Sequence, residues 1–322
     1  MQKYIASADI GATKIAVCIA SKSRILIKVL QKTKKQGSIY AIHNQIENLI
    51  DFCCKKISIK KSDLKRFGIV ACGVFKKQGK YSEVFANNIS GIGNSWGYIP
   101  LEKQFSKKYI LKIGNDAATS AKAEKLFGKA KNIKNFVYLT WSTGIGTGAY
   151  VDNNLLQGKN NNAPHGGHIY MAENGPKCSC GQKADMESLA SGSALEKIYG
   201  KKPIELFKDC KKGNKKAINL VKKVSKTLAK GLVSINAVLD TEMFVLGGSI
   251  MKHKSILLPL IQKEFYSNSF KPLTKDVKIT TSDLGEYIAD LAAFSLVLPK
   301  DWINRWQKTK PWKKIGTCII LD

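Results

Sequence analysis

One pattern occurs twice in this 322-residue chain and constrains its fold more than any other feature. An apolar run leads into a polar turn with glycine, and a second apolar run follows. The first copy spans residues 4–20 around the turn DIGATK, and the second spans residues 136–151 around STGIGTG. Because a strand rather than a helix follows the glycines, the pattern argues against a Walker-type loop and a dinucleotide-binding fold. The repetition predicts an internally duplicated α/β chain with a glycine hairpin on each of two lobes.

The rest of the chain alternates between helical and strand-like patterns. Apolar residues at helical spacing predict helices over residues 39–56, 117–127, 215–239, 256–265 and 287–298. Short apolar runs predict further strands over residues 24–31, 67–73, 110–113, 243–246 and 277–281. The segment 87–97 is rich in Asn, Gly and Ser and is expected to be a loop.

The chain is strongly basic, with 53 Lys and Arg against 24 Asp and Glu and a formal net charge of +29. Such a field attracts phosphates, nucleotides, RNA and acidic membranes. The lysines are scattered in short runs broken by apolar residues, however, and they do not form a long basic arm. No zinc-finger or RNA-binding-sheet signature accompanies them. We interpret the charge as a lysine-rich solvated surface and expect no specific nucleic-acid partner.

Cysteine usage and apolar segments predict the compartment. Eight cysteines in a chain of 322 residues do not make a dense disulfide framework. The first residues lack an apolar signal region, and no stretch approaches 18 uninterrupted apolar residues. The sequence therefore predicts a cytoplasmic protein with reduced thiols and no membrane partner.

The first glycine turn (residues 9–14) carries candidate phosphate-binding groups. Gly11 lets backbone N–H groups approach a phosphate because no Cβ blocks them. Thr13 adds a hydroxyl and Lys14 a cation, while Asp9 suits Mg²⁺ directly or through water. An ordinary β-hairpin turn is the alternative.

Two later glycine segments fit the same ligand. In the second glycine turn (residues 142–148), Thr143, Gly144 and Gly146 suit the β- and γ-phosphates of a nucleotide. Gly247 and Gly248 follow an apolar strand and would let a flat adenine lie against the backbone. A tight turn before a helix is the alternative for this second pair.

Asp116 follows a strand and begins a helix, which is where substrates bind in α/β folds. Phosphoryl transfer from ATP to an alcohol needs a base that accepts the hydroxyl proton. Asp116 fits that role, although a helix N-cap is the commoner use of Asp at such a position.

A short polar loop concentrates metal-binding residue types. Zinc takes four ligands, and this loop offers an imidazole, two thiols and a carboxylate in His168, Cys178, Cys180 and Asp185. Thiols this close in a reducing compartment more often bind metal than form a bridge.

The order of these motifs resembles the ROK sugar kinases and repressors, over residues 4–298. The resemblance rests on DIGATK, GNDAATSAKAE, STGIGTGAYV, VLGGSI and the His–Cys loop PHGGHIYMAENGPKCSCGQKADMESLASG. It implies an α/β fold of two actin-like (ribonuclease H-like) lobes with a nucleotide and sugar cleft between them. The expected division is an N-terminal lobe (1–115), a C-terminal lobe with its His/Cys loop at 165–187 (116–298) and a basic Trp-containing tail (299–322).

The resemblance also implies residue roles. Asp116 would be the base, and Cys178 and Cys180 would be zinc ligands. His168 would ligate zinc with one nitrogen and face the sugar. The other implied sugar-binding residues are Asn88, Asn115 and Glu187.

Two departures from the family pattern matter. Asp185 stands where a third Cys is usual, which puts zinc in question. His165 stands where many glucose-phosphorylating members have Glu, and in this it resembles bacterial N-acetylmannosamine kinases. A neutral imidazole offers one acceptor and one donor, so it suits an N-acyl carbonyl or an axial hydroxyl.

The sequence therefore predicts a kinase that transfers the γ-phosphoryl group of MgATP to a hexose or N-acylhexosamine hydroxyl, with N-acetylmannosamine preferred. Glucokinase-type activity is the first alternative, and a non-catalytic sugar-binding or regulatory protein is the second. Repressors of the family carry a winged-helix domain ahead of the first phosphate motif, and none is expected here because that motif begins at Asp9. By resemblance, a homodimer or homotetramer is expected.

Overall fold

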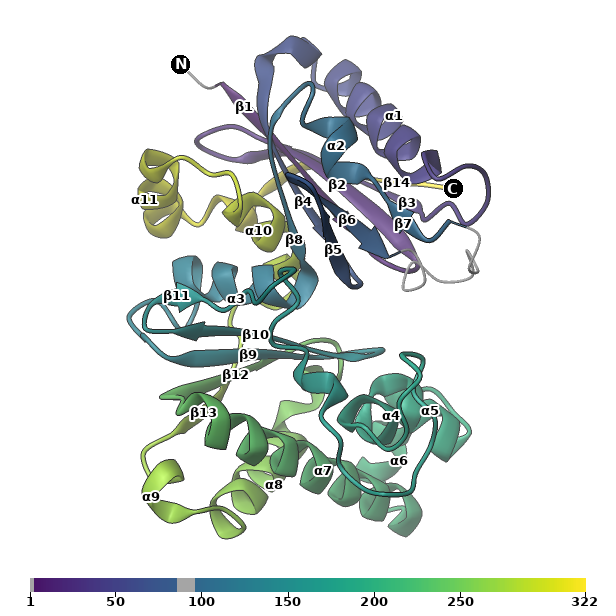
Figure 1. Ribbon diagram of the computed structural model, residues 1–322, viewed down its shortest axis with the longest axis vertical. Helices are drawn as coiled ribbons and strands as arrows, with labels where there is room; N and C mark the ends of the chain where they lie inside the picture. The colour runs from purple at the N-terminus through teal and green to yellow at the C-terminus, as the bar shows by residue number, and fades with distance from the viewer. Residues whose placement is uncertain (1–2, 86–95) are drawn as a thin grey trace. The chain divides into compact units, whose positions relative to one another are not determined.

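The computed structural model describes residues 3–85 and 96–322, and the chain forms two compact units (Figure 1). Unit 1 comprises Met1–Gly128, Gln157–Ala163 and Glu286–Asp322. Unit 2 comprises Lys129–Leu156 and Pro164–Gly285.

Unit 1 is built on a mixed sheet with the strand order β14-β3-β2-β1-β4-β8. Its strands are β1 (Tyr4–Ile10), β2 (Lys14–Ala20), β3 (Ile25–Lys32), β4 (Leu64–Ala71), β8 (Ile110–Asn115) and β14 (Ile315–Leu321). The first three form an antiparallel meander, whereas β4 lies parallel to β1 and β8 lies parallel to β4. The predicted strands of this region are confirmed, with bounds shifted by a few residues.

Helices cover both faces of the unit 1 sheet. Its helices are α1 (Ala41–Lys56), α2 (Leu101–Phe105), α3 (Asp116–Phe127), α10 (Ile288–Ser295) and α11 (Lys300–Thr309). Alternate residues of β1, such as Ala6 and Ala8, share an apolar core with Ile42 and Ile46 of α1. The opposite face of the sheet packs on α10. The backbones of β4 and α10 lie so close together that a Cβ on Gly68 of β4 would lie 2.1 Å from a carbonyl oxygen of α10.

A small antiparallel sheet completes unit 1. It consists of β5 (Phe75–Gln78), β6 (Tyr81–Phe85) and β7 (Tyr98–Ile99). The segment Gln157–Ala163 belongs to this unit because the side chain of Asn162 accepts from the N–H of Phe75 at 2.7 Å and donates to its carbonyl at 2.8 Å.

Unit 2 repeats the design with the strand order β11-β10-β9-β12-β13. Its strands are β9 (Phe136–Trp141), β10 (Ile145–Val151), β11 (Asn154–Leu155), β12 (Met243–Gly247) and β13 (Lys278–Thr281). Again the hairpin strands are antiparallel, and the later strands β12 and β13 continue the sheet in parallel. Strand by strand, the order and pairing in unit 2 match those of β3-β2-β1-β4-β8 in unit 1. The predicted internal duplication is therefore confirmed.

The core of unit 2 lies between its sheet and its two longest helices. The helices are α4 (Met186–Ala190), α5 (Gly192–Tyr199), α6 (Pro203–Lys211), α7 (Lys215–Leu239), α8 (Lys254–Ser267) and α9 (Lys271–Thr274). Buried residues of α7 and α8, such as Leu228, Leu232 and Ile261, pack with Leu139 and Phe244 of the strands. The α7 helix has the bounds that its apolar spacing predicts. The sequence pattern missed α4, α5, α6 and α9.

The unit boundaries differ from the predicted lobes, since the segments 116–128, 157–163 and 286–298 and the expected tail all belong to unit 1. The helix α3 belongs to unit 1, not to the second lobe, because it packs against α10. The predicted C-terminal tail is an integral part of unit 1. Its strand β14 pairs in parallel with β3, and Trp302, Trp306 and Trp312 are buried.

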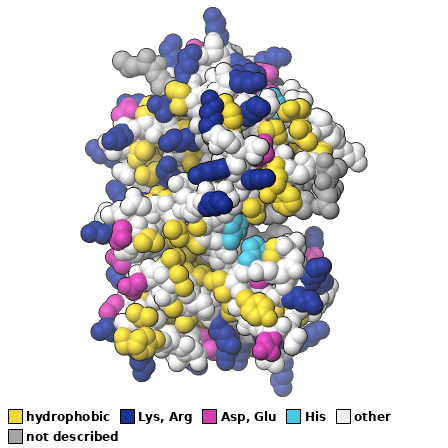
Figure 2. Space-filling view, viewed as in Figure 1, with side chains coloured by type: hydrophobic (Ala, Val, Ile, Leu, Met, Phe, Trp, Pro, Cys, Tyr) yellow, Lys and Arg dark blue, Asp and Glu magenta, His cyan; other side chains and the backbone are white. Residues whose placement is uncertain are grey.

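Figure 2 shows Lys and Arg side chains spread over the visible face without a single basic stripe. In the described part of the chain, none of the helices combines the length and apolar character that a membrane crossing requires.

Candidate functional site

The first glycine turn links β1 to β2 in unit 1. The N–H of Gly11 donates to the carbonyl of Lys14 at 3.1 Å. Thr33 ties the turn from the end of β3, since its hydroxyl donates to the carbonyl of Gly11 at 2.8 Å and its N–H to that of Thr13 at 3.0 Å. The side chains of Thr13 and Lys14 are exposed, so they are accessible to a ligand.

Asp116 is the first residue of α3, directly after β8. Its neighbour Asn115 is the N-cap, and the Asn115 Oδ1 accepts from the N–H groups of Ala117 and Ala118 at 3.0 and 3.2 Å. The Asn115 Nδ2 donates to the carbonyl of Gly73 at 3.3 Å. Asn115 therefore serves the helix end, and the half-buried Asp116 carboxylate lies beside it at the strand edge, where one of its oxygens accepts from the N–H of Ala117 at 2.8 Å.

Asp9, near the end of β1, lies in a cluster of acidic groups. Burial, reinforced by the negative charges of Asp290 and Asp116, raises the pKa of Asp9 from 3.8 to about 7, while Lys28 and Lys14 act in the opposite direction. Clustered oxygen donors of this kind suit a hard cation such as Mg²⁺, which would offset their mutual repulsion. Among these groups, Asp9 and Asp116 are the two that the sequence predicts, and unit 1 brings them together.

Three residues near this cluster escaped the sequence-based prediction. Asp290 enters from α10 and Lys28 from β3, far from both motifs along the chain. Cys72 follows β4, and burial together with the charges of Asp116 and Asp9 raises the pKa of its thiol. No local pattern marks these residues, because only the packing of α10 and the parallel pairing of β4 with β1 place them there.

The second glycine turn links β9 to β10 in unit 2, and several partners brace it. The N–H groups of Gly192 and Ser193, at the start of α5, donate to the carbonyls of Ser142 and Thr143 at 2.8 and 3.0 Å. The Glu187 Oε2 accepts from the N–H of Ile145 at 2.8 Å. A Cβ on Gly144 would lie 2.4 Å from that same oxygen, so a side chain at this position would displace the Glu187 carboxylate.

Gly247 and Gly248 lie beside the second glycine turn, as the nucleotide hypothesis needs. The N–H of Ser249 donates to the Ser142 Oγ at 2.9 Å. Gly248 has φ +93°, and a Cβ there would lie 2.4 Å from the backbone of Trp141. A side chain at this position would therefore disrupt both the turn and the strand next to it.

Glu187 and His165 are two of the predicted sugar-binding residues in unit 2. The Glu187 carboxylate joins the metal loop to the turn, since its Oε1 also accepts from the Cys178 Sγ at 3.6 Å. The His165 ring stacks on His168 at 5.8 Å between centroids. Its Nε2 is buried and has no hydrogen-bond partner among the described residues, so a ligand group would satisfy it. The predicted sugar-binding residue Asn88 lies outside the described residues.

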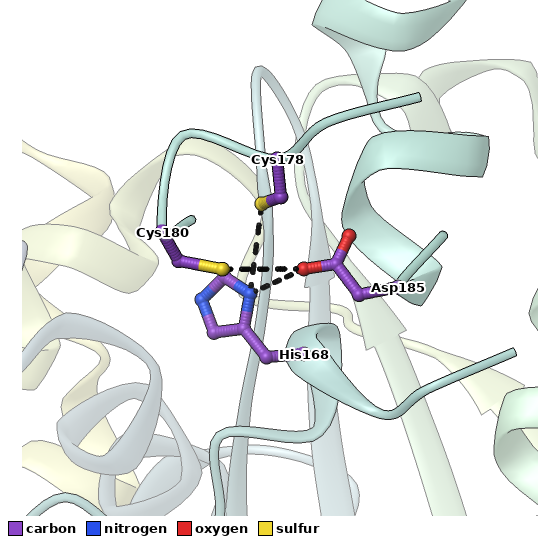
Figure 3. A group of neighbouring side chains, drawn as sticks. All are labelled: His168, Cys178, Cys180 and Asp185. Carbon is purple, nitrogen blue, oxygen red and sulfur yellow. Dashed lines mark hydrogen bonds and ion pairs between the residues drawn. The ribbon is translucent and has the colours of Figure 1, made fainter. Parts of the chain in front are cut away.

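The four predicted metal ligands converge in unit 2 (Figure 3). One ligand atom from each of His168, Cys178, Cys180 and Asp185 lies within 4.8 Å of the others. The Asp185 Oδ2 lies 2.8 Å from the His168 Nδ1 and 3.5 Å from the Cys180 Sγ. The other Asp185 oxygen caps α4 by accepting from the N–H of Ser188 at 2.7 Å. An imidazole, two thiols and a carboxylate are the ligand types of a tetrahedral zinc site, so these residues fit the metal.

A family model described as the ROK family matches residues 5–300. The chain belongs to the ROK family. This confirms the resemblance that the motifs carry, and the two-sheet α/β architecture is that of the ROK kinases.

Relatives of this ROK protein include both kinases and repressors. The N-acetylmannosamine kinase of Haemophilus influenzae (strain PittGG) is 28% identical over 263 residues, covering 79% of this chain and 83% of the kinase. The xylose repressor of Bacillus subtilis (strain 168) is 30% identical over 238 residues, covering 72% of this chain and 60% of the repressor. A ROK family glucokinase from Streptomyces griseus, solved with glucose and AMPPNP, is 23% identical with a TM-score of 0.71, covering 91% of this chain and 99% of that one.

Proposed function

We propose that this ROK protein is a sugar kinase that transfers the γ-phosphoryl group of MgATP to a hydroxyl of a hexose or N-acylhexosamine. The observation that carries the proposal is the Asp116 carboxylate at the β8–α3 junction, within electrostatic range of Asp9. The Asp116 carboxylate would orient the sugar hydroxyl and accept its proton as the phosphoryl group is transferred.

The glycine turns would bind the nucleotide. Thr13 and Lys14 of the first turn, and Thr143 with the backbone N–H groups of the second, supply hydroxyls, a cation and amide donors for phosphate oxygens. Mg²⁺ would be held by Asp9, directly or through water, and would neutralise charge on the phosphates. The backbone of Gly247 and Gly248 would lie against the adenine.

The sugar preference rests on His165. Burial, with a further contribution from His168, lowers the pKa of His165, which keeps its imidazole neutral at neutral pH. A neutral ring offers one donor and one acceptor, and its buried Nε2 is unpaired among the described residues. This supports an N-acetylated sugar over glucose, and the N-acetylmannosamine kinases among the relatives favour N-acetylmannosamine.

A coupled assay with MgATP and a panel of N-acetylmannosamine, glucose, N-acetylglucosamine and fructose tests the proposal. The highest kcat/KM is expected for N-acetylmannosamine. A preference for glucose would support the glucokinase alternative. Polyphosphate in place of ATP tests the donor. Absence of turnover with every sugar and both donors would refute the kinase assignment.

A sugar-responsive regulator is the second candidate, and the similarity to the xylose repressor favours it. In that case a sugar of the panel would raise the melting temperature without any turnover. A gel-shift assay titrated with salt would separate recognition of a DNA sequence from nonspecific attraction by the lysines.

A further inference from the structure

A partly buried ion pair lies next to Asp9 in unit 1 and includes no residue of either glycine turn. The Lys28 Nζ of β3 lies 2.5 Å from the Asp290 Oδ2 of α10. The Asp290 side chain is 2% exposed, and its other oxygen accepts from the Cys18 Sγ at 3.6 Å. Both oxygens therefore have partners, which fixes the orientation of the carboxylate.

The strand register brings this pair next to Asp9. Lys28 is the cross-strand partner of Cys18, and Cys18 is the partner of Ser7. Asp9 follows Ser7 by two residues, so its side chain points to the same face of the sheet. That face packs on α10, the helix that carries Asp290.

The two charges act on Asp9 with opposite signs. Asp290 repels the ionised carboxylate of Asp9, whereas Lys28 attracts it. Burial would lower the pKa of Lys28, but the charge of Asp290 raises it overall, so Lys28 stays protonated. In the intact pair the two charges offset each other. Without Asp290, an unopposed ammonium would remain beside the carboxylate that faces the cation.

We propose that Asp290 is a positioning residue for Mg²⁺–nucleotide binding, because it neutralises Lys28, whose unopposed positive charge would otherwise repel the cation at Asp9. The proposal rests on the proposed function, which assigns Asp9 to Mg²⁺. A buried ion pair adds little net stability compared with an apolar pair of the same size. The presence of the Lys28–Asp290 pair is better explained by the electrostatic potential that it sets at Asp9.

The test is calorimetric binding of ADP at a series of Mg²⁺ concentrations, which requires no turnover. Asp290→Asn is expected to raise the Mg²⁺ concentration at half-maximal binding by about tenfold, as one uncompensated charge at short range would. The double variant Lys28→Met/Asp290→Asn removes both charges and is expected to restore the midpoint to within about twofold. A purely structural role predicts the reverse, namely a double variant at least as impaired as the single one.

Asp301→Asn is the matched control. Asp301 pairs with Lys22 at 2.5 Å in the same unit, so the substitution makes the same change in net charge. Neither residue is among the charges that act on Asp9. The Mg²⁺ midpoint is expected to stay unchanged.

The outcomes separate this inference from the proposed function. Wild-type protein that does not bind ADP contradicts the proposed function. Wild-type protein whose Mg²⁺-dependent binding is unaltered by Asp290→Asn contradicts the inference alone. If Asp290→Asn does not fold, Lys28→Gln tests the same inference by removing the positive charge of the pair instead of the negative one. It leaves the Asp290 charge unopposed and should lower the midpoint, so a raised midpoint would overturn the inference.

Discussion

The two units repeat one strand order but stabilise their glycine turns differently. In unit 1, Thr33 ties the turn by two hydrogen bonds, and charged groups gather behind the strand at Asp9. In unit 2, the start of α5, Glu187 and Ser249 all bond to the turn. The side chains of Thr13 and Thr143 are exposed at the two tips.

This difference separates two tasks within a duplicated fold. Unit 1 brings the carboxylates of Asp9, Asp116 and Asp290 together near its turn, which suits cation binding. Unit 2 fixes backbone N–H groups in place and links them to the metal loop through Glu187. Substitutions in unit 1 should therefore change chemistry more than stability, and those in unit 2 should do the opposite.

The largest effect is expected from Asp116→Asn in unit 1. Loss of the base should lower turnover by about 10²–10⁴-fold, while sugar affinity stays nearly unchanged. A coupled kinase assay measures the first quantity and calorimetric sugar binding measures the second. Turnover close to that of the wild type would rule out Asp116 as the base.

Next in size is the effect expected from removing a candidate zinc ligand in unit 2. Cys178→Ser should remove bound zinc and lower the melting temperature by roughly 5 °C or more, because a metal that binds only the folded loop stabilises it. Metal analysis and thermal unfolding measure this. Cys210→Ser, at a half-buried thiol of the same unit outside the ligand group, should change neither. Full stability in metal-free Cys178→Ser protein would show that the loop needs no ion.

The same substitution in the two turns should have unequal effects. Gly144→Ala would displace the Glu187 carboxylate and should lower the free energy of unfolding by roughly 1–3 kcal/mol, through loss of its bond to the Ile145 N–H. Gly11→Ala places a Cβ 3.1 Å from the carbonyl oxygen of Lys14 and should cost less than about 1 kcal/mol. Urea unfolding compares them. Equal decreases in the free energy of unfolding would mean that the two turns are stabilised to the same degree.

The next prediction concerns the pH dependence of stability. Asp9 has a folded pKa of about 7 against 3.8, so the folded state binds more protons between these values, and its stability should fall as pH rises through this window. Asp9→Asn should flatten that slope, which is at most about 1.4 kcal/mol per pH unit, and should stabilise the protein at pH 8. Urea unfolding at several pH values, without Mg²⁺, measures it.

His165 in unit 2 should give stability the opposite dependence on pH. Its lowered pKa means that the unfolded state binds more protons just below pH 6.5, so stability is lost as the pH falls through that range. His165→Gln should remove this loss. An unchanged acid limb in His165→Gln would show that the ring titrates as an exposed histidine does.

Much of the architecture follows from local sequence patterns. The alternation of apolar residues in β1, β2, β9 and β10 marks both hairpins, and the spacing in 215–239 defines α7. The candidate metal-binding cluster was also predictable, because four residues of suitable chemistry lie within 18 positions of one loop, from His168 to Asp185. The small sheet β5-β6-β7 was not predictable, since such short strands carry little periodicity.

The sequence by itself determined the duplicated hairpins, their glycines and the family. Tertiary structure alone decided which distant side chains meet them. Asp290 lies 262 positions from Lys28 and 272 from Cys18, and only the return of the chain to unit 1 brings α10 onto β1. The physical reason is that periodicity and turn chemistry act within a few residues, whereas a charge cluster depends on which helix packs on which face of a sheet.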